Sequence, residues 1–451
     1  MRDSMPQILR NDDEGTPWQT AFLTLVGLLS STVLLKIVVV QYLEIIYLLQ
    51  ILILLLIFTS NDYQVVWYRP FLRLATFWTT FLVAAILLGL ASARFQFYLP
   101  DTISLLRRPI AVTFSRALEI GASVAILLYL AHEFRRSVRK RRFTMRLYFW
   151  AGVVSAVYSL LSYPLDVAGI ISLGAYGDAH RLRGFYNEGG PYGLYVLSLF
   201  FVGVALEKQG LESKLKIRSS FLLLAAVFVM AFSKAAICAG VALFFLNALF
   251  GLSLRKRLLM FGAGLLTLLA VAQTPFVGDA IKTFQKAGAS YERVSHFKAD
   301  DGNYVYGRVA GFFIVPRMIA EHPLTGVGLG NYGVLRNAPE YRGTAVWVDE
   351  ADDPGLGMAG YAAELGLPLF AFTYLCLFLP AIYLQRLHAP SYLINLALVQ
   401  PVVHSFGAQL NLTYPWIVTM FALGLGFSEA KSSNTESPAL LAMDAQSSGS
   451  V

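Results

Sequence analysis

The longest hydrophilic interval of this 451-residue chain carries residue types that suit chemistry on an anionic substrate. Its central stretch, Gly307 to Tyr332, combines Arg308 with a His-Pro dipeptide and a glycine-rich turn. Basic residues come first, and a cluster of carboxylates follows: Asp349, Glu350, Asp352 and Asp353. A basic region beside carboxylates suits a site that binds an anion and also needs a general base. The plain alternative is a solvated loop surface of mixed charge.

Two arginines of this stretch, Arg308 and Arg317, are candidates for contacting the anion. On one straight helix their spacing places them about 180° apart, at roughly 100° per residue. Pro316 is expected to break the helix, because proline lacks an amide hydrogen and clashes with the preceding turn. One ligand is therefore not expected to contact both arginines, and Arg308 is preferred.

A second group of cations lies in the segment HRLRGFYNEGGPYG, which contains Arg181 and Arg183. A guanidinium suits phosphate because it is planar, stays charged and donates two parallel hydrogen bonds. The glycines of this segment would let the backbone approach a ligand closely. The alternative is that the arginines anchor a helix end by extending to the membrane interface.

Lys234 follows Ser233 in the middle of a long apolar run. The run can form two short membrane spans, so the pair is expected at their outward turn. A lysine there is costly unless it meets an anion or water, which makes it a candidate binding residue; the alternative is a lysine that extends to the interface. His404 is read as a hydrogen-bonded core histidine in preference to a proton carrier.

The elements that position these residues are membrane helices. The chain is 56% hydrophobic and only 14% charged, whereas soluble domains are about 25% charged. Continuous apolar runs of about 18 residues or more recur, which indicates helices and not a barrel. The fold class is therefore an all-α polytopic membrane protein. The net charge of +8 flanks the spans, so we expect no nucleic-acid partner. Cys238 and Cys376 lie in apolar runs and predict neither a disulfide nor a metal site.

We expect about 12 transmembrane helices in a single domain, 20–428. It is preceded by a cytoplasmic leader, 1–19, without a cleaved signal peptide, and followed by a disordered cytoplasmic tail, 429–451. A large loop, 274–356, separates helices 9 and 10. The expected spans lie near 20–38, 42–59, 74–91, 112–131, 146–163, 191–206, 219–233, 235–252, 258–273, 357–382, 391–409 and 413–428.

Lysine and arginine in the short loops set the predicted orientation. Basic residues cluster at 135–146, 207–218 and 255–257, which places these segments and both termini in the cytoplasm. The loop 274–356, the segment 164–190 and a turn near Asn411 then face outward. No internal repeat is evident, which disfavours a secondary transporter with inverted repeats.

Four elements, in this order, resemble the O-antigen polymerase and O-antigen ligase superfamily of bacterial surface-glycan assembly. The similarity covers roughly residues 175–375. The glycine turn with its upstream arginine is the most specific element. The four elements are Arg181-x-x-Gly184; Phe232-Ser233-Lys234, with lysine in place of arginine; Arg308 followed by His322 to Tyr332; and Glu364-Leu365-Gly366-Leu367.

The resemblance implies about 12 membrane helices in the bacterial inner membrane, with an active site in the periplasmic loop. It implies transfer of a glycan from undecaprenyl pyrophosphate to an acceptor hydroxyl, with no metal, cofactor or nucleotide sugar. Arg181, Lys234 and Arg308 would then bind the donor pyrophosphate. Arg183 and Arg317 are second choices, and Glu364 is a further substrate-binding candidate. A chain-length regulator and a flippase are candidate partners, beside the lipid-linked oligosaccharide and the bilayer.

Departures from the family pattern bear on the reaction. Ligases carry a histidine nine residues before the glutamate of the last element, and Gly355 stands there in this chain. We therefore predict a carboxylate base, Asp353 or Asp352, and a polysaccharide polymerase. The Asp-Pro-Asn often found after Arg-x-x-Gly is replaced by Glu188-Gly189-Gly190. The alternatives are an O-antigen ligase acting on lipid A-core or protein and, from another class, a lipid-linked glycan flippase.

Overall fold

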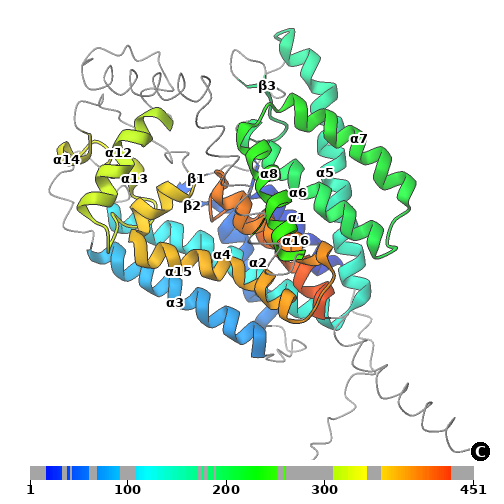
Figure 1. The fold of residues 1–451 in the computed structure, drawn as a ribbon, viewed down its shortest axis with the longest axis horizontal. Helices are drawn as coiled ribbons and strands as arrows, with labels where there is room; N and C mark the ends of the chain where they lie inside the picture. The colour runs from blue at the N-terminus through cyan, green and yellow to red at the C-terminus, as the bar shows by residue number, and fades with distance from the viewer. Residues whose placement is uncertain are drawn as a thin grey trace, which may run out of the picture.

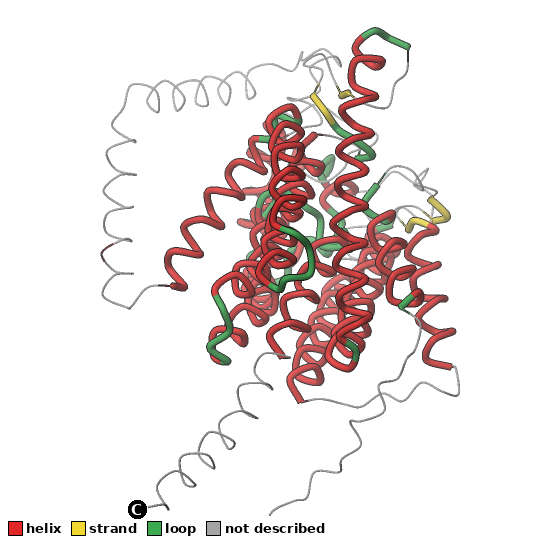
Figure 2. Tube along the Cα trace, turned by 90° about the vertical axis from the view of Figure 1, so that its right-hand side faces the viewer, coloured by secondary structure: helices red, strands yellow, loops and turns green. Residues whose placement is uncertain are grey.

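The computed structural model describes residues 17–32, 38–40, 43–59, 69–91, 108–170, 175–176, 181–186, 189–251, 259, 308–342 and 357–427. The predicted all-α class is confirmed for these residues, which are almost entirely helical (Figure 1). Two short antiparallel ladders accompany the helices, β1 (Val38–Val40) with β2 (Leu43–Glu44) and β3 (Ala175–Tyr176) with β4 (Arg181–Leu182). Figure 2 shows the long helices running alongside one another, with the strands at the periphery.

Outside the large loop, the described helices overlap the predicted apolar runs. Before the large loop they are α1 (Trp18–Leu29), α2 (Ile45–Thr59), α3 (Arg69–Ala91), α4 (Pro109–Arg136), α5 (Val138–Val167), α6 (Gly189–Lys208), α7 (Lys214–Met230) and α8 (Lys234–Gly251). Those within and after it are α12 (Arg308–Glu321), α13 (Tyr332–Leu335), α14 (Pro339–Arg342), α15 (Met358–Arg386), α16 (Ser391–Ser405) and a last helix, Thr413–Phe427.

Five of the described helices are long and apolar enough to cross a membrane: Leu72–Ala91 within α3, α4, α5, α6 and α15. Four shorter apolar helices accompany them, so the expected number of about 12 spans remains a prediction. The expected ninth span, 258–273, lies outside the described residues except for Leu259. The first expected span, 20–38, was wrong in its length, because α1 ends at Leu29. Polar residues follow there, and Ser30 Oγ donates to Gly27 O at 2.7 Å.

Glycines bring the membrane helices into close contact, as small residues do where helix association depends on packing. A Cβ on Gly89 of α3 would lie 2.4 Å from Thr113 of α4. A Cβ on Gly152 of α5 would lie 2.4 Å from Leu199 of α6. These distances are shorter than real Cβ contacts, so a larger residue would force the helices apart. The two pairs fix α3 against α4 and α5 against α6.

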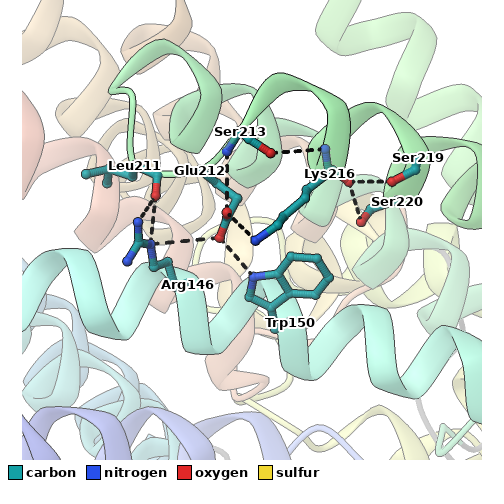
Figure 3. A network of polar contacts seen from close by, with 8 residues as sticks. All are labelled: Arg146, Trp150, Leu211, Glu212, Ser213, Lys216, Ser219 and Ser220. Atoms are coloured by element: carbon teal, nitrogen blue, oxygen red, sulfur yellow. Dashed lines mark hydrogen bonds and ion pairs between the residues drawn. The ribbon is translucent and has the colours of Figure 1, made fainter.

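Segments that the charge pattern assigns to the cytoplasm contact one another. In Figure 3, the carboxylate of Glu212, in the α6–α7 loop, accepts a hydrogen bond from Trp150 Nε1 of α5 at 3.3 Å. The same carboxylate lies 3.5 Å from Lys216 Nζ of α7. Arg146 Nε donates to Leu211 O at 2.7 Å. Arg141 Nη1 donates to Gly424 O of the last helix at 3.0 Å. The basic segments 135–146 and 207–218 therefore contact one another on one side of the bundle, and the orientation of the chain in the membrane stays a prediction.

The described part of the large loop, 308–342, is helical and lies beside α15 (Figure 1). The expectation that Pro316 breaks the helix was wrong, because α12 runs from Arg308 to Glu321 with Pro316 inside it. The residues around the proline are buried against the rest of the loop: Ile314, Val315 and Met318 pack with Tyr332 and Tyr341 among others. This apolar packing offsets the hydrogen bond that proline removes.

Candidate functional site

The glycine turn, Gly326–Asn331, is joined to a kink in α15 by main-chain hydrogen bonds. Val327 N donates to Ala363 O at 3.0 Å, and Gly328 N donates to Glu364 O at 2.9 Å. In the opposite direction, from α15 to the loop, Leu367 N donates to Pro323 O at 2.8 Å. Two of the four resembling elements therefore form one backbone-to-backbone seam.

The local sequence of α15 explains why its carbonyls are open to the turn. Gly366 has φ 71° and ψ 160°, which interrupts the helical hydrogen-bond pattern. In a regular helix Glu364 O would accept from residue 368, but that residue is a proline and has no amide hydrogen. Buried carbonyl groups need donors, and the glycine turn supplies them. The kink in α15 and the glycine turn thus supply each other's missing main-chain hydrogen-bond partners.

The other side of the glycine turn rests on α4. Thr113 Oγ1 donates to Leu329 O at 3.0 Å, and Asn331 Nδ2 donates to Thr113 Oγ1 at 3.2 Å. A Cβ on Gly330 would lie 2.6 Å from Cγ of Arg116. The turn is therefore held between two membrane helices, α4 and α15, which fixes the loop relative to the bundle.

A charged cluster lies where the turn meets α4. Arg116 Nη1 is 2.9 Å from Glu119 Oε2, and Asn411 Nδ2 donates to the same oxygen at 2.9 Å. The Glu119 side chain is 1% exposed, whereas that of Arg116 is 21% exposed. Glu364 also acts electrostatically on Arg116, and its Oε1 accepts from Tyr332 N at 3.3 Å. The cluster joins α4, the kink of α15 and the turn before the last helix.

Arg116 and Glu119 are not among the site residues predicted from the sequence, and both lie inside the expected span 112–131. A signal was available: opposite charges three residues apart share one helix face, and ionisable groups inside a membrane span are functional candidates. Arg336, which lies just after α13 and is 1% exposed, is not among the predicted site residues either. Nothing in its sequence context separates Arg336 from the other cations of the loop.

The first two resembling elements also come together, at the turn between α7 and α8 (Ala231–Ser233). Arg181 Nε donates to Ala231 O at 3.4 Å. Ser233 Oγ donates to Gly190 O at 3.2 Å, and a Cβ on Gly193 would lie 2.6 Å from Ser233 Cβ. Lys234 is the first residue of α8, directly after this turn, and is exposed. Two predicted cations, Arg181 and Lys234, therefore flank one turn.

The remaining predicted site residues have different positions. Arg317 Nη1 donates to Tyr341 O at 3.2 Å, which ties α12 to α14. Glu364 is 9% exposed. Arg183 is half-buried beside Arg181 in the described segment 181–186. Arg308 begins α12, and its side chain lies outside the described residues, as do Asp352 and Asp353 entirely.

His404 is fully buried, and its Nδ1 lies 3.0 Å from Ala408 O, as predicted for a core histidine. Neither cysteine forms a disulfide. Within the described ranges, no group of three or more His, Cys, Asp or Glu residues is placed to hold a metal ion.

No model of a known protein family matches the chain, and no curated protein matches it either. The geometry of the site and the order of its sequence elements are therefore the basis for assigning a function.

Proposed function

We propose that this chain is a membrane-bound polysaccharide polymerase. It transfers a glycan from undecaprenyl pyrophosphate to an acceptor hydroxyl of another lipid-linked repeat unit, on the periplasmic face of the bacterial inner membrane. The observation that carries the proposal is that two cations far apart in sequence flank one turn: Arg181 Nε donates to Ala231 O in the turn between α7 and α8, and Lys234 directly follows that turn. Among the described residues, neither side chain forms an ion pair.

Two such cations at the end of apolar helices favour an anionic ligand. An unpaired cation at a membrane edge is costly unless it meets water or an anion. A guanidinium and an ammonium can together neutralise a pyrophosphate, the first by paired hydrogen bonds and the second as a point charge. The polyprenyl pyrophosphate carrier places such an anion at the membrane surface.

The proposed reaction breaks the bond between the anomeric carbon of the donor sugar and the pyrophosphate oxygen. The electron pair leaves with the pyrophosphate, and Arg181 and Lys234 stabilise the charge that develops there. The acceptor oxygen forms the new glycosidic bond, and its proton passes to the base, for which Asp353 and Asp352 remain the predicted residues. Arg308 is the third proposed cation.

The seam between the glycine turn and α15 has a positioning role in this proposal. Arg308 begins α12, and the glycine turn follows the end of that helix at Glu321. Three main-chain hydrogen bonds between residues 323–328 and 363–367 hold the turn against α15. Fixing the end of α12 limits where Arg308 and the rest of the loop can lie. Catalysis by charge stabilisation depends on such preorganised geometry.

Gly355 in place of the ligase histidine favours a polymerase over a ligase. A flippase would need polar residues along the mid-membrane parts of several helices. The described polar clusters around Arg181 and Gly326 lie instead in segments assigned to the outward side, and Arg116 lies near the first end of the expected span 112–131.

Deleting the gene in its own host, then sizing the surface glycan and the lipid-linked pool, distinguishes these functions. A polymerase predicts surface glycan reduced to single repeat units, with single units on the carrier. Long polymer stranded on the carrier would indicate a ligase. Repeat units confined to the cytoplasmic side would indicate a flippase and would contradict the catalytic proposal.

A further inference from the structure

Phe232, in the turn between α7 and α8, has a backbone conformation that its side chain does not favour. Its φ is 47°, in the left-handed region where bulky L-residues are outliers. Its ring is 69% exposed and makes no aromatic contact with a described residue. Glycine or asparagine would adopt this conformation more easily. Strain that packing does not offset is a reason to look for a function in the side chain itself.

The strained turn points two neighbouring residues to different sides. Ser233 is buried, donates to Gly190 O at 3.2 Å and accepts from Ala236 N at 3.1 Å. Phe232 is exposed. The preceding residue, Ala231, accepts a hydrogen bond at its carbonyl from Arg181 Nε. Lys234 follows Phe232 by two residues and is also exposed. An exposed aromatic ring and two cations therefore share one edge of the bundle.

The exposed surface continues along both helices of the hairpin as apolar side chains, Val229 of α7 and Ile237 and Val241 of α8 among them. A ligand that complements this arrangement has an anionic head and a long apolar tail. The cations at the turn match the head, and the apolar helix faces match the tail.

We propose that the Phe232 ring contacts the isoprenoid units nearest the pyrophosphate of the donor, an inference that rests on the proposed function. The tail of the polyprenyl carrier then follows the outer faces of α7 and α8. Phe232 becomes a specificity-determining residue that distinguishes a polyprenyl pyrophosphate from the surrounding phospholipids.

The position of Phe232 at the level of the headgroup matters to this assignment. Deep in the bilayer, a side chain gains little by contacting a carrier tail instead of a lipid tail, because both are equally apolar. Near Lys234, the ring and the first isoprenoid units would otherwise be exposed to water. Their contact removes apolar surface from water and therefore favours binding. Phe244, ten residues further along α8 than Lys234, has the same 69% exposure and serves as the matched control.

Photocrosslinking tests the contact without requiring activity. Benzoylphenylalanine would be placed at position 232 or 244 of the full chain, in vesicles of phosphatidylethanolamine and phosphatidylglycerol containing undecaprenyl pyrophosphate. We expect the carrier to crosslink more strongly at 232 than at 244, and farnesyl pyrophosphate, which has only the first isoprenoid units, to compete at 232. Equal crosslinking at both positions, or phospholipid alone at 232, would overturn the proposal.

Kinetics with lipid-linked repeat units test the consequence. Phe232→Ala and Phe232→Gly should raise KM for the donor about fivefold with little change in kcat. Phe232→Trp, which keeps an aromatic ring, should raise KM less than Phe232→Ala does, and Phe244→Ala should behave as wild type. Phe232→Gly removes the strain, so it keeps the fold and separates a binding role from a structural one. An unchanged KM in Phe232→Gly would refute the role of the ring. If wild type forms no polymer yet crosslinks the carrier at 232, the lipid site stands and the polymerase assignment fails.

Discussion

Gly326 and Gly366 lie backbone against backbone. A Cβ on Gly326 would be 2.5 Å from the amide nitrogen of Gly366, and a Cβ on Gly366 would be 2.8 Å from that of Gly326. Both residues have positive φ, 62° and 71°. The seam between the large loop and the membrane helices therefore requires glycine on both sides, for space and for backbone conformation.

Gly366→Ala should therefore separate the glycine turn from α15. We expect it to lower the free energy of unfolding by about 1–3 kcal/mol, the usual scale for strain at such a position, and to reduce polymer formation. Gly240→Ala is the control, because its Cβ would meet only Leu197 Cδ1 at 3.7 Å and its backbone is helical. Thermal unfolding in detergent measures both variants. Equal stability of Gly366→Ala and wild type would contradict the seam.

Glu119→Ala should destabilise the chain more than removal of the whole ion pair. The variant leaves the Arg116 charge in a membrane helix without its carboxylate at 2.9 Å. Breaking one side of a buried pair costs about 3–5 kcal/mol, whereas apolar replacement of both partners is often close to neutral.

The double variant Arg116→Met/Glu119→Leu should thus recover much of the lost stability. A double-mutant cycle by denaturant or thermal unfolding gives the coupling energy. If the changes in unfolding free energy of the two single variants summed to that of the double variant, Arg116 and Glu119 would not act as a pair.

Glu212 gives a pH prediction on the opposite side of the bundle. Although burial opposes it, the Trp150 indole, the Ser213 amide and Lys216 together lower the pKa of the Glu212 carboxyl below its ordinary value of 4.5. A lowered pKa means that the folded state binds this proton less readily than the unfolded state does. Its stabilisation is therefore present above about pH 4.5 and is lost as pH falls through the lower folded-state pKa.

Unfolding of wild type and Glu212→Gln should differ most near neutral pH and converge on acidification. Glu207→Gln, in the last turn of α6, is a control without these contacts among the described residues. A difference that grew as the pH fell would contradict the predicted sign.

The helical class could be predicted from the sequence, but the contacts among the four resembling elements could not. Arg181 could be selected because it lies in a glycine-rich segment, and Lys234 because it interrupts a long apolar run. The continuity of α12 through Pro316 could not be predicted from the sequence, because it depends on burial of Ile314 and Met318 against residues later in the loop. Long-range packing of this kind leaves no local pattern.

The α15 kink is a similar case with a partial signal. Gly366 and Pro368 together indicate an interrupted helix, and the sequence contains both. The partner that satisfies the freed carbonyls, the glycine turn, is more than thirty residues earlier, so its identity needed the structure. The Arg116–Glu119 pair could be predicted from its spacing alone, although the span around it is strongly apolar.

The central claim is that Arg181 and Lys234 stabilise a departing pyrophosphate. The most direct measurement follows purified protein in vesicles with its lipid-linked repeat unit, recording polymer formed and undecaprenyl pyrophosphate released. Arg181→Ala and Lys234→Ala should each lower kcat about 100-fold, the scale for losing one charge-stabilising group. Lys234→Arg should retain most activity, and Lys214→Ala, an exposed lysine at the other end of α7, should be unaffected. Full polymer formation and release by the Arg181→Ala/Lys234→Ala double variant would contradict the claim.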